Sequence, residues 1–270
     1  MHDMGDMNTT NLLLKERHAF IRQRLLADGR VLALDLAQQL NVSEDTIRRD
    51  LRDLAAAGLC TRVYGGALPL PPAPGPLAER RAQAPERKAQ LARAAVSLVT
   101  AGNVLFIDAG STNLEIAAAL PELPLTVVTN AAAVALALQE RPAIELIMIG
   151  GRVDRRSGAN LGAAALRDAE RMRPDIFFLG GCGVDATAGV TCFNYEEAEF
   201  KRSLAAVSKA VLVAATSEKF GTAATYAVLP AAHLTHLVLE SDTDSSQAGE
   251  FARQGVQLLY ADADYLKAQP

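Results

Sequence analysis

The sequence has no run of apolar residues long enough to cross a membrane, and it opens with the acidic, polar stretch MHDMGDMNTT. A membrane-spanning helix needs about 20 consecutive apolar residues, and a secretory signal has basic residues followed by an apolar segment. The sequence has neither feature. We therefore expect a cytoplasmic protein that has no membrane partner.

Cysteine is scarce, because the chain has only Cys60, Cys182 and Cys192, far apart and without a C-x-x-C pair. This pattern excludes a disulfide framework and a cysteine-based zinc site. His233 and His236 have a spacing that metal ligands use, but no third ligand suggests itself, and the leucine between them is typical of a strand. We therefore predict three free thiols, no metal ion and no cofactor.

The chain also lacks an excess of positive charge, since 27 Lys and Arg residues stand against 31 Asp and Glu, giving a net charge of −4 at pH 7. This balance excludes nucleic-acid binding by the whole surface, but it leaves room for a local basic face. With 270 residues and half of them hydrophobic, the chain is long enough for two folded domains.

One stretch, LPLPPAPGPLAERRAQAP at 68–85, contains six prolines and a glycine and has no periodic apolar pattern until its end. This composition is typical of an extended, partly stiff linker. We therefore predict a disordered tail at 1–11, a front domain at 12–67, the linker at 68–85 and a back domain at 86–262.

The front domain has the pattern of three helices. The first is predicted at 12–29, where it ends with glycine, the second at 32–40, and the third within VSEDTIRRDLRDLAAAG at 42–58. Ser43 precedes two acidic residues and is a typical helix N-cap, because its hydroxyl can accept from a free backbone N–H.

The third helix separates its charges by side. Ile47, Leu51 and Leu54 have the spacing of a core-facing stripe. Its arginines lie on the opposite side, and its aspartates form a separate flank. These residues are Arg48, Arg49 and Arg52, and Asp50 and Asp53.

Arginines exposed on the second helix of a helix-turn-helix unit suit the major groove, where guanidinium groups bind guanine edges and phosphates. The alternative is an ordinary solvated surface helix, in which Asp45 pairs with Arg49. The next segment, LCTRVYGGALPL, has two short strand-like runs around a Gly-Gly turn, which is typical of a wing that lies on the DNA backbone. The predicted DNA-binding residues are Ser43, Glu44, Thr46, Arg48, Arg49, Arg52, Arg62, Tyr64 and Gly65.

The front domain resembles the DNA-binding domain of the DeoR family of bacterial sugar-metabolism repressors. The resemblance rests on TIRRDL at Thr46–Leu51 and R-x-x-GGA at Arg62–Ala67, and it extends over the whole predicted unit. It implies a winged helix-turn-helix that binds double-stranded operator DNA. Tyr64 stands where many members of the family have histidine.

The back domain alternates short apolar runs with helical segments. This order predicts a Rossmann-like α/β domain with a mainly parallel sheet that is buried on both faces. The predicted strands lie in NVLFID, LTVVTN, IELIMIGG, DIFFLGG, AVLVAAT, LTHLVLE and VQLLYA.

The segment LFIDAGSTN places Asp108, Gly110, Ser111 and Thr112 between a strand and a helix. Glycine, hydroxyl groups and a helix N-terminus together suit a phosphate, although capped turns of this kind are common and the segment is neither a Walker nor a dinucleotide-binding motif. The runs VTN, IGG and LGGCGVD close three other predicted strands. Because the ends of parallel strands share one edge, we expect a ligand crevice there.

These segments resemble the effector domain of the DeoR family, which is related in fold to ribose-5-phosphate isomerase and glucosamine-6-phosphate deaminase, from about Glu86 to Glu240. The resemblance implies a sugar-phosphate site, with Glu197 and Lys201 near it. Its other expected residues are Asp108, Gly110, Ser111, Thr112, Asn130, Gly151 and Lys219. Two departures from the family pattern are Thr216, where many members have aspartate, and Asn113, where many have threonine.

The predicted function is a DNA-binding transcriptional regulator, a repressor of carbohydrate-metabolism genes, that a phosphorylated sugar or related effector controls. An operator with repeated half-sites would require a homodimer or homotetramer. The main alternative is a sugar-phosphate isomerase or deaminase, with Asp108 and Glu197 as acid and base and the front domain as an interaction module. The acidic and basic residues around Glu197 also fit ordinary helix pairs, above all with Lys201. A protein-binding scaffold is the third possibility.

Overall fold

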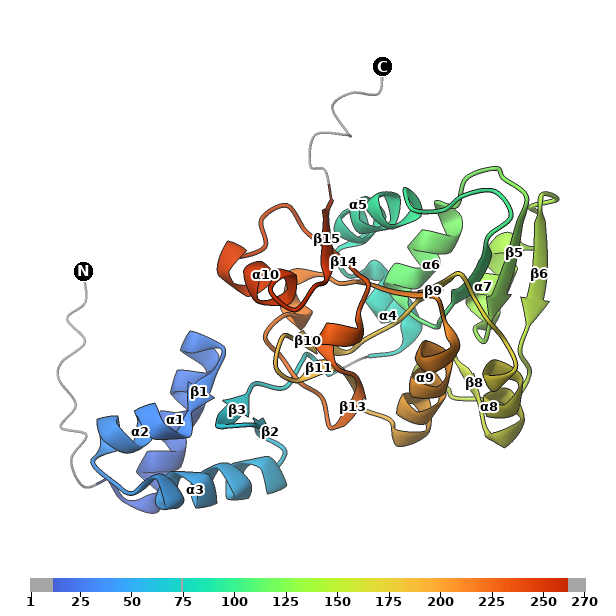
Figure 1. Ribbon diagram of the computed structural model, residues 1–270. Coiled ribbons are helices and arrows are strands. Elements are labelled where there is room, and N and C mark those ends of the chain that lie inside the picture. Colours follow the sequence, from blue (N-terminus) through green and yellow to red (C-terminus); the bar gives the residue numbers. More distant parts are fainter. Residues whose placement is uncertain (1–11, 74, 262–270) are drawn as a thin grey trace.

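The computed structural model describes residues 12–73 and 75–261, so the predicted tail at 1–11 lies outside the described residues. The buried apolar side chains of the described ranges form two separate clusters, one within residues 21–67 and one within residues 91–261. Figure 1 shows the corresponding bodies, the smaller N-terminal one and a larger C-terminal one. The two cores indicate two folding units, as the length of the chain suggests.

The N-terminal unit is a winged helix-turn-helix, as predicted. Its sheet is antiparallel, with the order β1-β3-β2. The three helices pack around Ile21, Leu36, Ile47 and Leu51, all buried. The elements are α1 (Leu14–Asp28), β1 (Val31–Leu32), α2 (Ala33–Leu40), α3 (Glu44–Ala56), β2 (Thr61–Val63) and β3 (Gly66–Leu68).

The segment between the two units differs from the extended linker that its composition predicts. Residues Leu77–Ala82 form a helix, α4, and α5 (Pro85–Val96) begins three residues later. The prolines at 69, 71, 72 and 76 all precede α4. Pro85 lies in the first turn of α5, where a helix tolerates proline. The run LAERRA is therefore free to form helix, and α4 packs against α6 (Ser111–Ala118).

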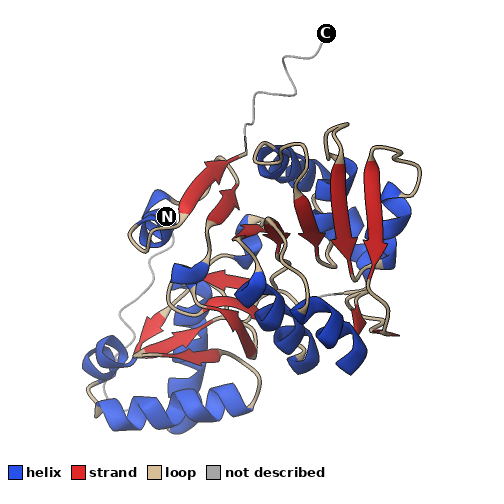
Figure 2. Ribbon diagram, turned by 45° about the vertical axis from the view of Figure 1, so that its right-hand side comes forward, coloured by secondary structure: helices blue, strands red, loops and turns tan. Residues whose placement is uncertain are grey.

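The C-terminal unit contains, among its described residues, a seven-stranded sheet with the order β15-β14-β12-β9-β4-β5-β6. Every neighbouring pair is parallel, and each of the predicted strand runs contains one of these strands. Figure 2 shows the strands with helices packed around them. The bounds are β4 (Val104–Ile107), β5 (Leu125–Thr129), β6 (Ile144–Met148), β9 (Ile176–Phe178), β12 (Ala210–Ala214), β14 (His236–Leu239) and β15 (Gln257–Tyr260).

Two smaller antiparallel sheets were not predicted as such. One is the hairpin of β7 (Arg152–Val153) and β8 (Asn160–Leu161), and the other has the order β10-β11-β13. The strands of the latter are β10 (Gly183–Asp185), β11 (Gly189–Cys192) and β13 (Tyr226–Leu229). The remaining helices are α7 (Ala132–Leu138), α8 (Ala163–Glu170), α9 (Tyr195–Val207), α10 (Ser245–Ala252), η1 (Ser217–Lys219) and η2 (Ala231–His233).

The order of the large sheet reverses at its centre. From β4 the chain adds β5 and β6 on one side, and from β9 it adds β12, β14 and β15 on the other. β4 and β9 are therefore neighbours at a topological switch point, and ligands of open α/β sheets bind outside the carboxyl ends of such strands. The fold places the segments after Ile107 and after Phe178 side by side at this position.

The small sheet β10-β11-β13 lies toward the N-terminal unit in Figure 1, and side chains connect the two units there. The Thr61 hydroxyl donates to the Ala223 carbonyl at 2.6 Å, and the Ala223 N–H donates to the Pro69 carbonyl at 3.1 Å. Arg30 bonds Thr187 and lies 3.7 Å from the Asp185 carboxylate. The wing of the front domain thus contacts the back domain directly.

The three cysteines are free thiols. Within residues 12–73 and 75–261, no helix is both long enough and apolar enough to span a membrane.

Candidate functional site

The third helix, α3, presents its arginines to solvent. Its core stripe is buried as predicted, and the side chains of Arg48 and Arg49 are 58% and 68% exposed. Ser43 is the N-cap, and its hydroxyl accepts from the Thr46 N–H at 3.2 Å. The helix-turn-helix therefore holds a rigid basic face that is available to another molecule.

The exposed arginines have local acidic partners. Arg48 lies 2.7 Å from Glu44, and Arg49 lies 3.7 Å from Asp45, both one helical turn away. Exposed pairs of this kind contribute only about 0.3–0.5 kcal/mol, so a DNA phosphate can replace the partner at little cost. The pairing predicted as an alternative is thus present, and it does not remove the basic face.

Asp50 does not belong to the exposed acidic flank that the helical pattern predicts. It is 1% exposed, and Arg17 of α1 binds it with both nitrogens of one guanidinium edge, Nη2 at 2.9 Å. The His18 ring lies 3.3 Å away. The interaction raises the pKa of Arg17, first through its hydrogen bond to Asp50. Asp50 therefore joins α3 to α1, and its burial further separates the negative charge from the arginine face.

The wing carries the rest of the predicted DNA-binding residues. β2 and β3 pair antiparallel, and Arg62 on β2 is exposed. Tyr64 at the tip is 97% exposed, and Gly65 has a φ of 78°, which glycine adopts at no steric cost. Arg52 is also exposed on α3, so all four predicted DNA-binding arginines are accessible to solvent.

A cavity of about 120 Å³ opens at the switch point of the large sheet. Six of the predicted effector residues line it, and Asp108 lies directly beneath them, fully buried. Gly180 allows the close approach of the two strand ends, because a Cβ there would lie 2.8 Å from the Ala109 carbonyl. The predicted lining residues are Gly110, Ser111, Thr112, Glu197, Lys201 and Lys219.

The floor of the cavity is a buried ion cluster. The Lys201 ammonium lies 2.5 Å from Glu197 and 3.2 Å from Asp108, and it donates to the Gly180 carbonyl at 2.6 Å. Burial alone would lower the pKa of Lys201, but the two carboxylates raise it above its usual value. All three ammonium protons have acceptors, and both carboxylates have a partner, so the cluster fixes β4, β9 and α9 together.

Asn113 connects the same strand ends. Its side-chain amide donates to the Asp108 carbonyl at 3.1 Å and to the Phe178 carbonyl at 3.0 Å. The departure from threonine at this position thus supplies two hydrogen bonds within the protein.

Two predicted residues, Asn130 and Gly151, do not line the cavity. The Asn130 carbonyl accepts from the Asn160 N–H at 2.6 Å, and Gly151 lies against the backbone of Leu161. Both positions support the β7–β8 hairpin, whose loop contributes Asp154, Arg156 and Ser157 to the lining.

Lys219 comes from η1 on the opposite wall. Its ammonium donates to the Gly181 carbonyl at 2.8 Å. Burial lowers the pKa of Lys219 to about 8, because few solvent molecules stabilise its charge. An anion beside it would supply that stabilisation.

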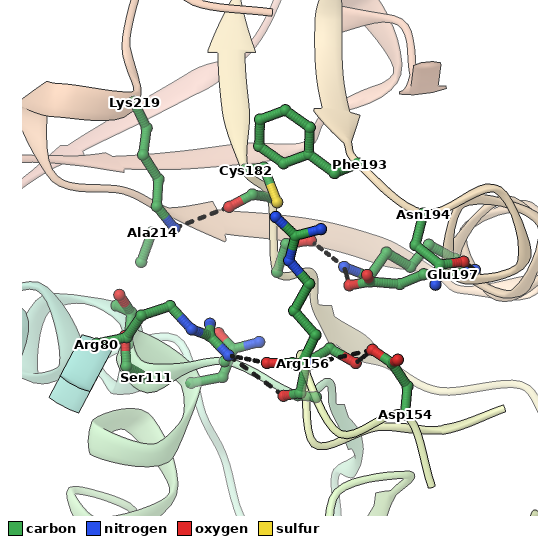
Figure 3. A pocket seen from close by; sticks show the side chains of 18 residues that line it. Arg80, Ser111, Asp154, Arg156, Cys182, Phe193, Asn194, Glu197, Ala214 and Lys219 are labelled. Carbon is green, nitrogen blue, oxygen red and sulfur yellow. Dashed lines mark hydrogen bonds and ion pairs between the residues drawn. The ribbon is translucent and has the colours of Figure 1, made fainter. Parts of the chain in front are cut away.

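Several lining residues were not predicted from the sequence. Figure 3 shows Arg80 entering from α4, Arg156 from the hairpin loop and Lys219 from the opposite wall. Arg156 lies over the Phe193 ring, 5.8 Å from its centre. The arginine pairs in LAERRAQ and VDRRSG were visible signals, but only the fold shows that one arginine of each pair reaches the cavity. The other unpredicted residues include Asp154, Ser157, Cys182, Phe193 and Asn194.

The cavity has a basic balance. The residues that line it include four cations and two acids, namely Arg80, Arg156, Lys201 and Lys219 against Asp154 and Glu197. Both acids have partners, since Glu197 shares the Lys201 ammonium with the buried Asp108, and Asp154 accepts from the Ser157 N–H at 2.9 Å. The α6 N-terminus adds positive potential at the same point. The arrangement favours an anionic ligand.

The fold and these two surfaces define a DNA-binding protein with a ligand-sensing domain. The chain belongs to the DeoR family of transcriptional regulators. Residues 17–70 match the model of the DeoR-like helix-turn-helix domain, and residues 83–241 match that of the DeoR C terminal sensor domain.

Curated relatives match three quarters or more of the chain. A putative aga operon transcriptional repressor of Escherichia coli O157:H7 is 30% identical over 90% of this chain and 93% of its own length. The glycerol-3-phosphate regulon repressor of Escherichia coli K12 is 34% identical over 76% and 82%. These relatives are named as regulators, so the chain is a transcriptional regulator, and the isomerase or deaminase alternative is not favoured.

Similarity to solved structures is more distant. Ribose 5-phosphate isomerase A of Methanocaldococcus jannaschii has 17% identity and a TM-score of 0.37, over 50% of this chain and 54% of its own. Among the described residues, no group of three or more His, Cys, Asp or Glu side chains is arranged to hold a metal ion.

Proposed function

We propose that this chain represses carbohydrate-metabolism genes in the cytoplasm and releases its operator when a phosphorylated sugar or related metabolite binds the sensor domain. The observation that carries the proposal is the basic cavity at the switch point of a domain joined to a winged helix-turn-helix. Relatives named for the aga operon and the glycerol-3-phosphate regulon support this ligand class.

The DNA contacts follow from the exposed basic face of α3. Arg48, Arg49 and Arg52 enter the major groove, and the N-terminal end of the helix, with Ser43, Glu44 and Thr46, meets base edges first. Arg62, Tyr64 and Gly65 of the wing contact the adjacent backbone. The basic side chains make this binding sensitive to salt.

The effector contacts follow from the cavity. The phosphate lies between Gly110, Ser111, Thr112 and Lys219, where backbone amides, hydroxyls and one ammonium are close together. Asp108, Glu197 and Lys201 hold the floor, and Asn130 and Gly151 place the hairpin that closes one side. The residues of the floor and of the hairpin thus position the groups that contact the phosphate.

The active form is a homodimer or homotetramer. A single winged helix reads only a short half-site, and an operator with repeated half-sites is read by a symmetric assembly. Sedimentation velocity of the free protein and of its complex with DNA tests this part of the proposal.

The function is tested by a gel shift with a duplex that contains the promoter of the protein's own gene. We expect a shift that competitor DNA of unrelated sequence does not abolish, and that weakens when a phosphorylated sugar from a panel is added. The same panel is screened by thermal shift, with each unphosphorylated sugar as its matched control. No shift at low salt, or sugar-phosphate turnover in its place, contradicts the proposal.

A further inference from the structure

Arg80 belongs to α4, in the segment that joins the two domains, and it lines the cavity of the sensor domain. Its Nε donates to the Gly75 carbonyl at 3.1 Å. Its Nη2 lies 3.3 Å from the Ser157 carbonyl and 3.4 Å from the Arg156 carbonyl, across the cavity (Figure 3). The guanidinium thus bridges the interdomain segment and the hairpin loop.

A buried lysine holds α4 in place. Lys88 of α5 is 7% exposed, and its ammonium donates to the carbonyls of Arg80 and Gln83 at the end of α4. Carbonyls at a helix C-terminus favour a cation. Because a spacer would need no such anchor, the contacts indicate that the position of Arg80 matters.

Arg80 and Lys219 stand at the passage between two cavities. Both residues, with Ser111 and Cys182, line the cavity at the switch point and also a neighbouring one of about 480 Å³. The acid in the larger cavity, Glu218, is already paired with Arg87. Two cations from separate segments therefore face a common space at the N-terminus of α6.

The partners that these cations now have are neutral. Lys219 donates to one backbone carbonyl, and Arg80 donates to three, two of them at 3.3 Å or more. Hydrogen bonds between charged groups are about twice as strong as those to neutral groups, and a guanidinium fork fits a phosphate with two parallel bonds. A phosphate at the passage would replace the long carbonyl contacts.

Both cations belong to segments that also carry contacts between the domains. The Thr222 hydroxyl donates to the Lys219 carbonyl at 2.8 Å, and the next residue, Ala223, bonds Thr61 and Pro69 at the wing. Pro69 begins the same interdomain segment that carries Arg80. A ligand held by both cations would thus act on both connections to the wing.

We propose that Arg80 is an effector-binding residue that the interdomain segment supplies, and that with Lys219 it takes the anionic group of the ligand. Ligand binding then fixes the segment against the sensor domain and changes the position of the wing. The inference rests on the proposed function, and it adds the residue that joins ligand recognition to DNA release.

The test compares the full chain with Arg80→Gln and with Arg81→Gln, which removes the same charge from an exposed neighbour on the same helix. Calorimetry measures binding of inorganic phosphate and of glycerol 3-phosphate, and anisotropy of a labelled promoter duplex measures DNA binding. We expect Arg80→Gln to bind both anions about tenfold more weakly, and Arg81→Gln to match the wild type. Both variants should bind DNA as the wild type does, but glycerol 3-phosphate should no longer release DNA from Arg80→Gln.

The Tm of Arg80→Gln shows whether this variant is folded. If it is not, Arg80→Lys takes its place in the test. Arg80→Lys retains the charge without the planar fork, and we expect an intermediate loss of phosphate affinity. Equal phosphate affinity in the wild type and in a folded Arg80 variant overturns the inference, and so does a wild type that binds neither anion. Loss of DNA binding by the wild type, with normal phosphate binding, would contradict the proposed function and leave the role of Arg80 intact.

Discussion

The two domains both gather cations, but they do so in different surroundings. On α3 the arginines are exposed and paired only with neighbours on their own helix, whereas in the sensor domain Arg80, Arg156 and Lys219 converge on a cavity from three segments. An exposed face suits a long polyanion and is screened by salt. A cavity suits one small anion and selects its shape. The exposed cations of α3 therefore suit DNA, and the cations around the cavity suit a small anion, because the two groups differ in burial.

The largest effect should come from the buried cluster of the sensor domain. Lys201→Met removes the cation between Asp108 and Glu197 and leaves two buried carboxylates without a positive charge beside them. We expect the free energy of unfolding to fall by about 3–5 kcal/mol, measured by urea denaturation. Lys209→Met removes an exposed lysine, 80% accessible, and should cost less than about 0.5 kcal/mol. Equal losses would contradict the assigned role of burial.

Asp50 and Asp53 allow the same comparison of a buried with an exposed charge within α3. Asp50→Asn weakens the pair with Arg17, and because Arg17 is partly exposed we expect a smaller loss of about 2–3 kcal/mol. Asp53→Asn alters an exposed aspartate of the same helix and is the matched control. The thermal unfolding of the front domain reports both, and a stable Asp50→Asn variant would show that this buried pair contributes little.

The exposed arginines should affect binding and not folding. Arg49→Ala should leave the Tm unchanged, weaken operator binding by about 1 kcal/mol or more, and lower the slope of log K against log salt by about 1. Arg22→Ala, which removes an exposed arginine of α1, is the control. Filter binding at several salt concentrations makes the comparison. Unchanged affinity and slope for Arg49→Ala would exclude the groove-facing assignment and favour a scaffold.

The smallest effect is a pH dependence that only the sensor domain should show. The pKa of Lys219 is lowered to about 8, mainly by burial and also by the cations Arg80, Lys201 and Lys88, whereas Cys182 raises it. Because a phosphate favours the protonated lysine, binding should weaken as the pH rises through 8, by about threefold between about pH 7.5 and 8.5. Calorimetry with inorganic phosphate measures this change.

Lys219→Arg is the control for that titration, because arginine keeps its proton throughout this range. The phosphate affinity of this variant should not change with pH in the same interval. An equal decline in both proteins would assign the titration to another group.

Much of the fold was predictable because its signals are local. The apolar runs that alternate with helical segments correspond to the seven parallel strands, and the N-cap at Ser43 and the stripe at Ile47, Leu51 and Leu54 define α3. The two strands of the β7–β8 hairpin have only two residues each, which is too few for a periodic pattern. Their places depend on the tertiary fold.

The site was predictable only in part, for the same reason. Residues at strand ends, such as Ser111 and Thr112, could be assigned because parallel strands share an edge. Arg80 comes from a proline-rich segment, and Arg156 comes from a loop between two short strands, so no local pattern places them in the cavity. Asp50 is buried by a partner 33 residues away, which a helical wheel does not include.

The most direct test of the account measures the affinity of the full chain for its promoter duplex with and without a phosphorylated ligand that calorimetry has shown to bind. We expect saturating ligand to change the Kd for DNA by at least about tenfold, a coupling of about 1.4 kcal/mol. The same Kd with the sensor domain saturated would contradict it.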